Sequence, residues 1–357
     1  MGQSEANEGG VARRATIKDV AALAGVSWKT VTNVLRGYPP TRESTRLRVL
    51  AATEQLGYRT NRAGRQLRTG KTGIIAVALP DVSVAYFAQL AQLFITEADK
   101  HDYHVLFYET LQDPARERIA ASGLDGDFAD GVIISPVALD AVGVAQSGRS
   151  IPIVVLGESA DGSRADHVAI DNHRAAVQAT QHLLSLGCRA IHFFGAEPGE
   201  RTGTGGQRLS GVLEALATAG IHTADEPTWR SQPYSYEGGA QGVAELLASG
   251  REFDGLVCGN DGVALGAIHA LRLAGLRVPQ DVAVMGWDDT MAGRYANPTL
   301  STVRPDSVQL VRLAFNKLLA RIDGDSSPYE EIVIPHELVI RESTSGHPHP
   351  GKPDDGA

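Results

Sequence analysis

The chain reads TIKDVAALAGVSWKTVTNVL from residue 16 to residue 35, and this stretch has the pattern of two short helices joined by a tight turn. Thr16 and Asp19 have the spacing of a capping box, so a helix over about residues 17–24 is expected directly after Thr16. Gly25 then supplies the left-handed backbone conformation that ends many helices. The sequence therefore predicts a helix-turn-helix near the start of the chain.

The second helix is expected to begin after Ser27, whose hydroxyl can cap it, and to end near Leu35. Its outward side chains suit the major groove of DNA. Lys29 can donate to guanine, Asn33 can pair with adenine or a phosphate, and Trp28 offers apolar area to a thymine methyl. Hydroxyl groups can position a helix on phosphates without reading sequence. The candidate DNA-binding residues of this stretch are Thr16, Ser27, Trp28, Lys29, Thr30, Thr32, Asn33 and Arg36.

A third helix, over about residues 42–56, is expected to complete this small core through Leu47, Leu50 and Leu56. Residues 11–71 contain 13 Lys and Arg but three acidic residues, although the whole chain has a net charge of −9. A basic unit joined to an acidic body is typical of a DNA-binding head on a soluble sensor. A three-helix bundle without a ligand has the same periodicity, so composition and residue identities must decide between the two.

The pattern T-I-x-D-V-A-x-x-A-G-V-S-x-x-T-V, which begins at Thr16, resembles the start of the LacI/GalR family of bacterial regulators, and the similarity continues to about Ser343. It implies an N-terminal all-α helix-turn-helix domain and an α/β body similar to a periplasmic sugar-binding protein. Such a body has two Rossmann-like subdomains, three crossovers and a ligand in the cleft. Arg42 occupies the place of the family's usual capping serine, so Thr41 is expected to cap the third helix, and Tyr58 is a further candidate DNA contact.

In that family the segment matching residues 61–68 is a hinge helix in the minor groove, where a leucine pair opens the central base step. Leu67 matches that leucine, and Asn61 and Arg65 are further candidate DNA contacts. An apolar wedge can kink a duplex because extra protein contacts offset the unstacking energy. Gly64 stands where the family usually has alanine and costs about 1 kcal/mol in a helix interior, so the hinge is expected to be disordered without DNA.

From Gly73 onward, short β-rich runs alternate with helical segments, which is typical of parallel α/β layers. The runs cover residues 74–79, 105–108, 132–135, 153–156, 191–194, 256–258 and 282–285. Ligands in such sheets bind outside the carboxyl ends of the strands. The residues selected by that rule are Asp81, Ser135, Glu158, Asn260 and Asp288.

The resemblance narrows the choice to five candidate effector-binding residues. By motif, Arg208 in QRLSG matches the family's effector-binding arginine, Asp288 in GWDD matches an acidic contact, and Asn260 lies at the cleft floor. Tyr234, and Phe87 in AYFAQL, match aromatic residues that contact the ligand. Arginine and aspartate can clamp hydroxyls while an aromatic ring covers a sugar's apolar face. Packed aromatics, a structural salt bridge and a capping pair are the alternative interpretations.

The expected organisation is a disordered tail at 1–13, a DNA-binding domain at 14–60, a hinge at 61–71, an effector-binding domain at 72–343 and a disordered tail at 344–357. In the effector-binding domain, one subdomain takes about 72–187 and 303–331, and the other about 188–302 and 332–343. The last segment lacks heptads, so no tetramerising coiled coil is expected. A homodimer is expected, because two heads would address a roughly palindromic operator.

Other classes of protein fit the sequence less well. No run reaches the roughly 20 apolar residues of a membrane span, and the polar start lacks signal-peptide features, so a cytoplasmic protein is expected. Residues 64–72 are one residue too long for a P-loop, and the common hydrolase, zinc-protease and dinucleotide motifs are missing, so no catalytic residues are expected. Cys188 and Cys258 are expected to be buried thiols, and neither a metal nor a cofactor is expected.

The sequence therefore predicts a dimeric transcription regulator, in the first place a repressor, that binds double-stranded operator DNA under the control of a small molecule. A carbohydrate is the leading effector. A nucleobase or other metabolite that acts as a corepressor, an activator role, and a ligand-binding protein without a role in transcription are the alternatives.

Overall fold

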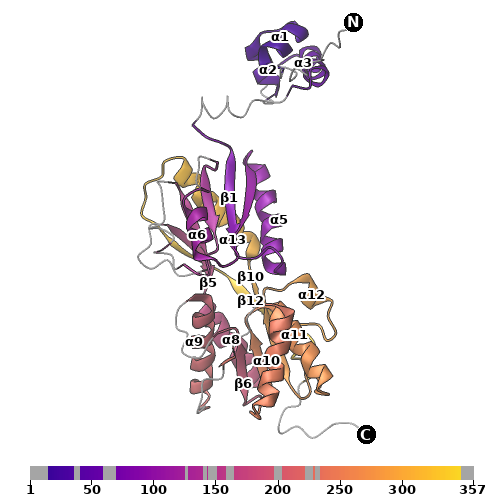
Figure 1. The fold of residues 1–357 in the computed structure, drawn as a ribbon, viewed down its shortest axis with the longest axis vertical. Coiled ribbons are helices and arrows are strands. Elements are labelled where there is room, and N and C mark those ends of the chain that lie inside the picture. The colour runs from indigo at the N-terminus through magenta and orange to yellow at the C-terminus, as the bar shows by residue number, and fades with distance from the viewer. Residues whose placement is uncertain are drawn as a thin grey trace, which may run out of the picture. The chain divides into compact units, whose positions relative to one another are not determined.

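The computed structural model describes residues 15–35, 41–58, 70–124, 128–139, 143, 151–157, 165–196, 203–221, 228–229 and 234–346. The chain divides into two compact units, Met1–Thr72 and Gly73–Ala357. The first unit holds α1 (Ile17–Ala24), α2 (Trp28–Leu35) and α3 (Glu43–Gln55), and the second unit holds two sheets with their covering helices (Figure 1).

The turn between α1 and α2 confirms the predicted helix-turn-helix. Thr16 Oγ1 accepts a hydrogen bond from the Asp19 amide at 3.4 Å, and the Asp19 carboxylate accepts one from the Thr16 amide at 2.8 Å. Gly25 ends α1 with φ 65°, a conformation that glycine adopts without steric cost. Ser27 Oγ then accepts from the Thr30 amide at 3.1 Å, which caps α2.

The buried face of α3 differs from the prediction. Leu47 and Leu50 are 58% and 41% exposed, whereas Val49 and Ala52 are buried. Val49, Ala52 and Leu56 follow the i, i+3, i+7 spacing of one helix face, and this face packs into the core of the head. The core contribution predicted for Leu47 and Leu50 is therefore wrong, although that of Leu56 is confirmed.

The start of α3 also differs from the prediction. Arg42, and not Thr41, is the N-cap residue, and its side chain makes no capping hydrogen bond. Glu43 places a negative charge in the first turn, where it interacts favourably with the helix dipole. The capping role predicted for Thr41 is therefore wrong.

The first sheet of the second unit is parallel, with the order β11-β5-β4-β3-β1-β2 among the described residues. Its strands are β1 (Ile74–Leu79), β2 (His104–Glu109), β3 (Gly131–Ile134), β4 (Ile153–Leu156), β5 (Asp166–Ile170) and β11 (Glu331–Ile334). The helices that contact it are α5 (Ala85–Lys100), α6 (Pro114–Ala121) and α13 (Ser307–Ile322) (Figure 1). Every residue of β3, β4 and β5 is buried, as expected for a sheet covered on both faces.

The second sheet has the order β12-β10-β9-β8-β6-β7 among the described residues, and only the β12-β10 pair in that order is antiparallel. Its strands are β6 (Ile191–Phe194), β7 (Thr228–Trp229), β8 (Gly255–Cys258), β9 (Ala283–Trp287), β10 (Ser301–Pro305) and β12 (His336–Val339). The helices of this subdomain are α8 (Asn172–Ser185), α9 (Gly203–Thr218), α10 (Tyr236–Ala248), α11 (Asp261–Leu273) and α12 (Met291–Arg294). Parallel strands place their carboxyl ends at one edge, where β6, β8 and β9 end together.

The chain passes between the two sheets three times, after Ile170, Pro305 and Ile334. The sequence placed these crossings near residues 187, 302 and 331. The first crossing differs most, because α8 packs against α9 and β8 of the second subdomain. A Cβ atom on Gly211 of α9 would lie 2.3 Å from the carbonyl oxygen of His173 of α8, so the two backbones touch.

The described residues extend past the expected start of the C-terminal tail. Thr344 is fully buried, and its hydroxyl lies 2.7 Å from Ser301 Oγ and 3.0 Å from His182 Nε2. Ser343 Oγ donates to the carbonyl of Val284 at 2.6 Å. Hydroxyls that are buried need such partners, so residues 343–344 belong to the second subdomain.

Helices α10 and α11 approach one another at two glycines. A Cβ atom on Gly266 would lie 1.8 Å from the carbonyl oxygen of Tyr236, and one on Gly239 would lie 2.0 Å from that of Val263. No side chain fits between these helices, so their backbones are in direct contact. The contact fixes α10 and α11 as one rigid pair.

Gly266→Ala is expected to lower the free energy of unfolding of the second unit by about 1–3 kcal/mol, the usual cost of overpacking. This loss should appear even though alanine favours a helix interior by about 1 kcal/mol. Urea unfolding followed by circular dichroism measures it. Gly262→Ala is the matched control on the same helix, because its Cβ would meet Asn260 Oδ1 at an ordinary 3.4 Å. An unchanged or raised midpoint for Gly266→Ala would contradict the close contact.

Candidate DNA-binding and effector sites

Helix α2 presents one polar face to solvent and one apolar face to the core of the head. Trp28 is 51% exposed, and Lys29 and Asn33 are also exposed. Val31 and Val34 are buried on the opposite side. The predicted division of the helix into an outward polar face, the candidate reading face, and a core face is therefore present in the structure.

The hydroxyl groups around the reading face also make local hydrogen bonds. Ser27 Oγ lies 2.9 Å from Thr30 Oγ1, and Thr32 Oγ1 donates to the carbonyl oxygen of Trp28 at 3.0 Å. The ammonium of Lys29 lies 5.9 Å from the centroid of the Trp28 ring, at the outer limit of a cation–π contact. The Ser27–Thr30 pair uses one of its two hydroxyl protons and therefore keeps one that can be donated to a phosphate or to water, whereas the Thr32 proton is already donated to the Trp28 carbonyl.

The remaining predicted DNA contacts fall in two groups. Tyr58 is described: it is half-buried and packs against the head's core, and its amide donates to the carbonyl oxygen of Thr53 at 2.9 Å. The predicted contacts outside the described residues are Arg36, Asn61, Arg65 and Leu67. The predicted hinge, its state without DNA, and both expected tails apart from residues 344–346 also lie outside the described part of the chain.

In the second unit, Arg208 on α9 is fixed by three partners at the carboxyl ends of strands. Its Nε donates to Asn172 Oδ1 at 3.0 Å, and a terminal nitrogen donates to the carbonyl oxygen of Gly259 at 2.5 Å. Its guanidinium carbon lies 3.9 Å from the centroid of the Trp287 ring, which is a close cation–π stack. The orientation of this arginine is therefore set before any ligand binds.

Asp288 follows β9 on a strained turn close to Arg208. Its φ is 104° and that of Asp289 is 54°, and non-glycine residues pay about 1–3 kcal/mol each for such backbone. No described residue donates a hydrogen bond to its carboxylate. Burial raises the pKa of Asp288 well above its ordinary range, the charge of Asp261 raises it further, and Arg208 opposes both. A carboxyl in this state can donate to, or accept from, a ligand hydroxyl.

The charges of the same two residues also act on Tyr86, at the start of α5 in the first subdomain. Burial and the charge of Asp288 raise the pKa of Tyr86 above its ordinary value, and Arg208 lowers it. The Phe87 ring lies beside it on α5, with centroids 5.4 Å apart and a 58° tilt. The start of α5 therefore contributes Tyr86 to the electrostatic surroundings of Arg208 and Asp288, with Phe87 beside Tyr86.

Tyr234 and Asn260 are joined to one another at the ends of β6 and β8. The Tyr234 hydroxyl donates to the carbonyl oxygen of Gly195, and a Cβ atom on Gly259 would lie 2.6 Å from the Tyr234 ring. Asn260 Oδ1 caps α11 by accepting from the Val263 amide at 2.8 Å, and its Nδ2 donates to the Tyr234 carbonyl at 3.2 Å. The amide of Asn260 therefore holds Tyr234 in place.

Two further residues selected by the strand-end rule make hydrogen bonds outside this cluster. Asp81 Oδ1 accepts from the amide and the hydroxyl of Ser83, at 2.8 and 2.6 Å, in a local turn. The Ser135 amide donates to the carbonyl oxygen of Ala78 at 3.0 Å. Glu158 lies outside the described residues.

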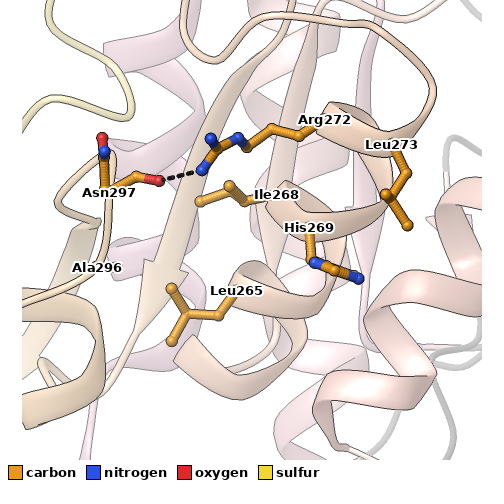
Figure 2. Close-up of a pocket in the computed structure, with 7 residues that line it drawn as sticks. All are labelled: Leu265, Ile268, His269, Arg272, Leu273, Ala296 and Asn297. Carbon is orange, nitrogen blue, oxygen red and sulfur yellow. Dashed lines mark hydrogen bonds between the residues drawn. The ribbon is translucent and has the colours of Figure 1, made fainter.

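A separate depression lies on the second subdomain, against the outer side of α11. Its lining residues are Leu265, Ile268, His269, Arg272, Leu273, Ala296 and Asn297 (Figure 2). Arg272 donates to the carbonyl oxygen of Asn297 at 3.0 Å across it (Figure 2). None of the five predicted effector-binding residues lines this depression, so it is distinct from the cluster around Arg208.

Family models match both units of the chain. The model described as "Bacterial regulatory proteins, lacI family" covers residues 16–61, and "Periplasmic binding protein-like domain" covers residues 180–344. The HTH-type transcriptional regulator RegA of Clostridium saccharobutylicum is 30% identical over 330 residues, which are 92% of this chain and 99% of that protein. The chain belongs to the LacI family.

Solved structures of LacI-family proteins share the fold. The lac repressor dimer bound to operator and the anti-inducer ONPF matches with a TM-score of 0.79 at 26% identity, over 93% of this chain and 99% of that chain. The complex of the transcriptional regulator CelR with cellobiose matches with a TM-score of 0.68 at 27% identity, over 92% and 100%. The predicted fold class is confirmed, and the relatives are transcriptional regulators, as predicted, and not enzymes.

Three residues of this LacI-family site were not selected from the sequence. Trp287 and Tyr86 stand next to Asp288 and Phe87 in the motifs GWDD and AYFAQL, so those motifs could have indicated them. Asn172 follows the carboxyl end of β5, a strand that the sequence did not predict. The strand-end rule would have selected Asn172 if β5 had been recognised.

No described helix is both long and apolar enough to cross a bilayer. In the same residues, no group of three or more His, Cys, Asp and Glu side chains could hold a metal ion. Cys188 and Cys258 are both free and buried, which confirms the prediction of buried thiols.

Asp261, the first residue of α11, is a buried carboxyl at the edge of the site. It is 1% exposed and accepts from the Thr290 amide at 2.6 Å, the Thr290 hydroxyl at 2.9 Å and the Thr302 hydroxyl at 2.8 Å. Burial raises the pKa of Asp261 to about 6, although these three hydrogen bonds lower it. Asp261 is therefore expected to bind its proton more tightly in the folded protein than in the unfolded chain.

Asp261→Asn is expected to flatten the pH dependence of stability. A carboxyl whose folded pKa is raised stabilises the fold at low pH, and that contribution is lost as the pH rises from about 4 to about 6. At about 1.4 kcal/mol per pH unit, the loss is about 3 kcal/mol. Urea unfolding at pH 4 and pH 7 measures it, with Asp99→Asn, exposed on α5, as the control. Equal pH dependence in the wild type and Asp261→Asn would contradict the assignment.

Proposed function

We propose that this protein is a dimeric repressor that binds a palindromic operator and releases or engages it in response to a sugar or sugar-like effector. The exposed reading face of α2 supports the DNA part of this proposal. Trp28, Lys29 and Asn33 point away from a core built by Val31 and Val34, so a tryptophan, a lysine and an asparagine are offered to a groove rather than to the protein.

The dimer is proposed from the size of the reading face and from a relative. One recognition helix reads only a few base pairs, so specific operators need two heads related by a two-fold axis. The lac repressor is seen as a dimer on its operator. We assign the same arrangement to this chain, acting in the cytoplasm where its operator lies.

The effector site is proposed at Arg208 and Asp288. Arg208 is oriented by Asn172 and Trp287, while the Asp288 carboxyl has no hydrogen-bond donor among the described residues. Tyr86 supplies an aromatic side chain beside them. A guanidinium group and a carboxyl group can hydrogen-bond the hydroxyls of a sugar, and an aromatic ring can cover the apolar face of the sugar ring. CelR, a relative with the same fold, binds cellobiose.

Lys29→Ala and Asn33→Ala are each expected to weaken binding to the DNA upstream of the protein's own gene. Losing one good base contact costs about 1–3 kcal/mol, which is roughly 5- to 150-fold in Kd. Fluorescence anisotropy over a salt series measures both affinity and the number of phosphate contacts. Lys100→Ala is the control, because this lysine is 59% exposed on α5 of the second unit. The DNA assignment would be wrong if wild-type protein showed no salt-dependent affinity for any duplex.

Arg208→Ala and Asp288→Asn are expected to keep operator affinity without sugars but to lose the response to the effector. Removing a charge-assisted hydrogen bond of about 1.5–3 kcal/mol should weaken effector binding by roughly 10- to 150-fold. A thermal-shift panel of sugars and nucleobases, followed by operator binding with each hit, measures this.

His269→Ala is the matched control for this test, because His269 lies in the depression of Figure 2 and outside the proposed site. A normal response from Arg208→Ala and Asp288→Asn would place the effector elsewhere. Hits confined to nucleobases would overturn the sugar assignment and leave the regulator intact.

A further inference from the structure

Asp289, the residue after Asp288, is buried inside a cluster of three arginines. It is 1% exposed. Arg294 donates to Oδ2 at 2.7 Å, Arg341 donates to Oδ1 at 2.5 Å, and a terminal nitrogen of Arg304 lies 3.4 Å from Oδ2. Hydrogen bonds from Arg341 and Arg294 outweigh the effect of burial and hold the pKa of Asp289 below its ordinary value. This carboxylate is therefore ionised and saturated with donors.

The three arginines come from three different segments of the second subdomain. Arg294 ends α12, Arg304 lies on β10, and Arg341 follows β12. Arg304 also forms an ion pair with Glu337, its cross-strand partner on β12. Strands β10 and β12 each adjoin a crossing between the subdomains, so the cluster ties the residue beside the effector site to the connecting strands.

The backbone that carries Asp288 is anchored on the same strand. The Asp288 amide donates to the carbonyl oxygen of Val303 at 2.8 Å, and the Asp289 amide donates to Thr302 Oγ1 at 3.3 Å. Both aspartates have positive φ, a conformation that persists only where the surroundings over-determine it. The arginines around Asp289 provide that constraint.

We propose that Asp289 is a positioning residue: by binding Arg294, Arg304 and Arg341, it holds residues 288–290 in the conformation that directs Asp288 toward Arg208 and Tyr86. The inference rests on the proposed function only in treating Asp288 as an effector contact. Buried ion pairs add little net stability, because desolvation offsets their attraction, but they can specify one geometry. A cluster built for stability alone would not need to sit on the one strained turn beside the site.

Trp287 reports on this turn directly, because it precedes Asp288 and stacks on Arg208. The chain has three tryptophans, so protein labelled with 5-fluorotryptophan gives few fluorine resonances. Trp287→Phe assigns the relevant resonance. The chemical shift of that resonance is followed as a function of pH in the wild type and in Asp288→Asn. The transition that is lost in Asp288→Asn belongs to the Asp288 carboxyl, and transitions that remain belong to other groups such as Asp261 and Tyr86.

Asp289→Asn is expected to move the Trp287 resonance and to lower the midpoint of the Asp288 step by roughly one pH unit or more. Loss of the negative charge at residue 289 and access of a released carboxyl to water both lower that midpoint, so the Trp287 resonance is the signal that reports movement of the turn. Asp281→Asn is the matched control: it removes an aspartate that is paired with the exposed Arg277 at 2.6 Å and that precedes β9, at the opposite end of this strand from Asp288. That variant should leave the resonance and the titration unchanged.

A lower melting temperature in Asp289→Asn with an unchanged Trp287 resonance and Asp288 step would overturn the proposal, since Asp289 would then only stabilise the fold. If Asp289→Asn does not fold, Arg304→Gln and Arg294→Gln each remove one donor and are read in the same way. Operator binding is measured on the same proteins. If the wild type binds no operator, the proposed function is wrong. The positioning role of Asp289 is then still tested by the Trp287 resonance.

Discussion

The half-buried guanidinium of Arg208 is the constraint around which the strand ends of the second unit are arranged. Arginine keeps its proton in a protein interior, so its charge and its donors must be satisfied where it lies. Asn172, Gly259 and Trp287 meet that demand from the segments that follow β5, β8 and β9. One side chain on α9 therefore fixes the relative positions of three strand ends, and a ligand meets a surface that is already organised.

The three aspartates near this arginine differ because their partners differ. Asp289 is surrounded by arginines and stays ionised, Asp261 is bound by threonine hydroxyls and an amide, and Asp288 is left with no described donor. The first two hold the backbone, and the third is the carboxyl that we propose binds the effector. Similar residues thus take structural and recognition roles according to the groups packed beside them.

Much of the fold followed from sequence patterns where apolar runs were continuous. The strands Ile74–Leu79, Ile153–Leu156 and Ile191–Phe194 were predicted to the residue, because each is a largely apolar run of which all or nearly all residues are buried. The strands β5, β10, β11 and β12 were missed, because their sequences DHVAI, STVRP, EIVI and HELV mix charged and apolar residues. Because β5 was missed, the strand-end rule did not select Asn172. For the same reason the predicted boundary near residue 187 assigned α8 to the first subdomain and not to the second. Leu47 and Leu50 misled the prediction because α3 buries small residues and exposes leucines.

The backbone contact between α10 and α11 limits how this body can respond to a bound molecule. Tyr234 precedes α10 and Asn260 caps α11, so both residues are attached to the N-terminal ends of these helices. Because the two backbones are in direct contact, the helices cannot slide past each other. A molecule that pulls on either residue must displace both helices as one block. If a ligand binds at Tyr234 or Asn260 as predicted, the expected response is a movement of α10 and α11 together and not a rearrangement of one helix against the other.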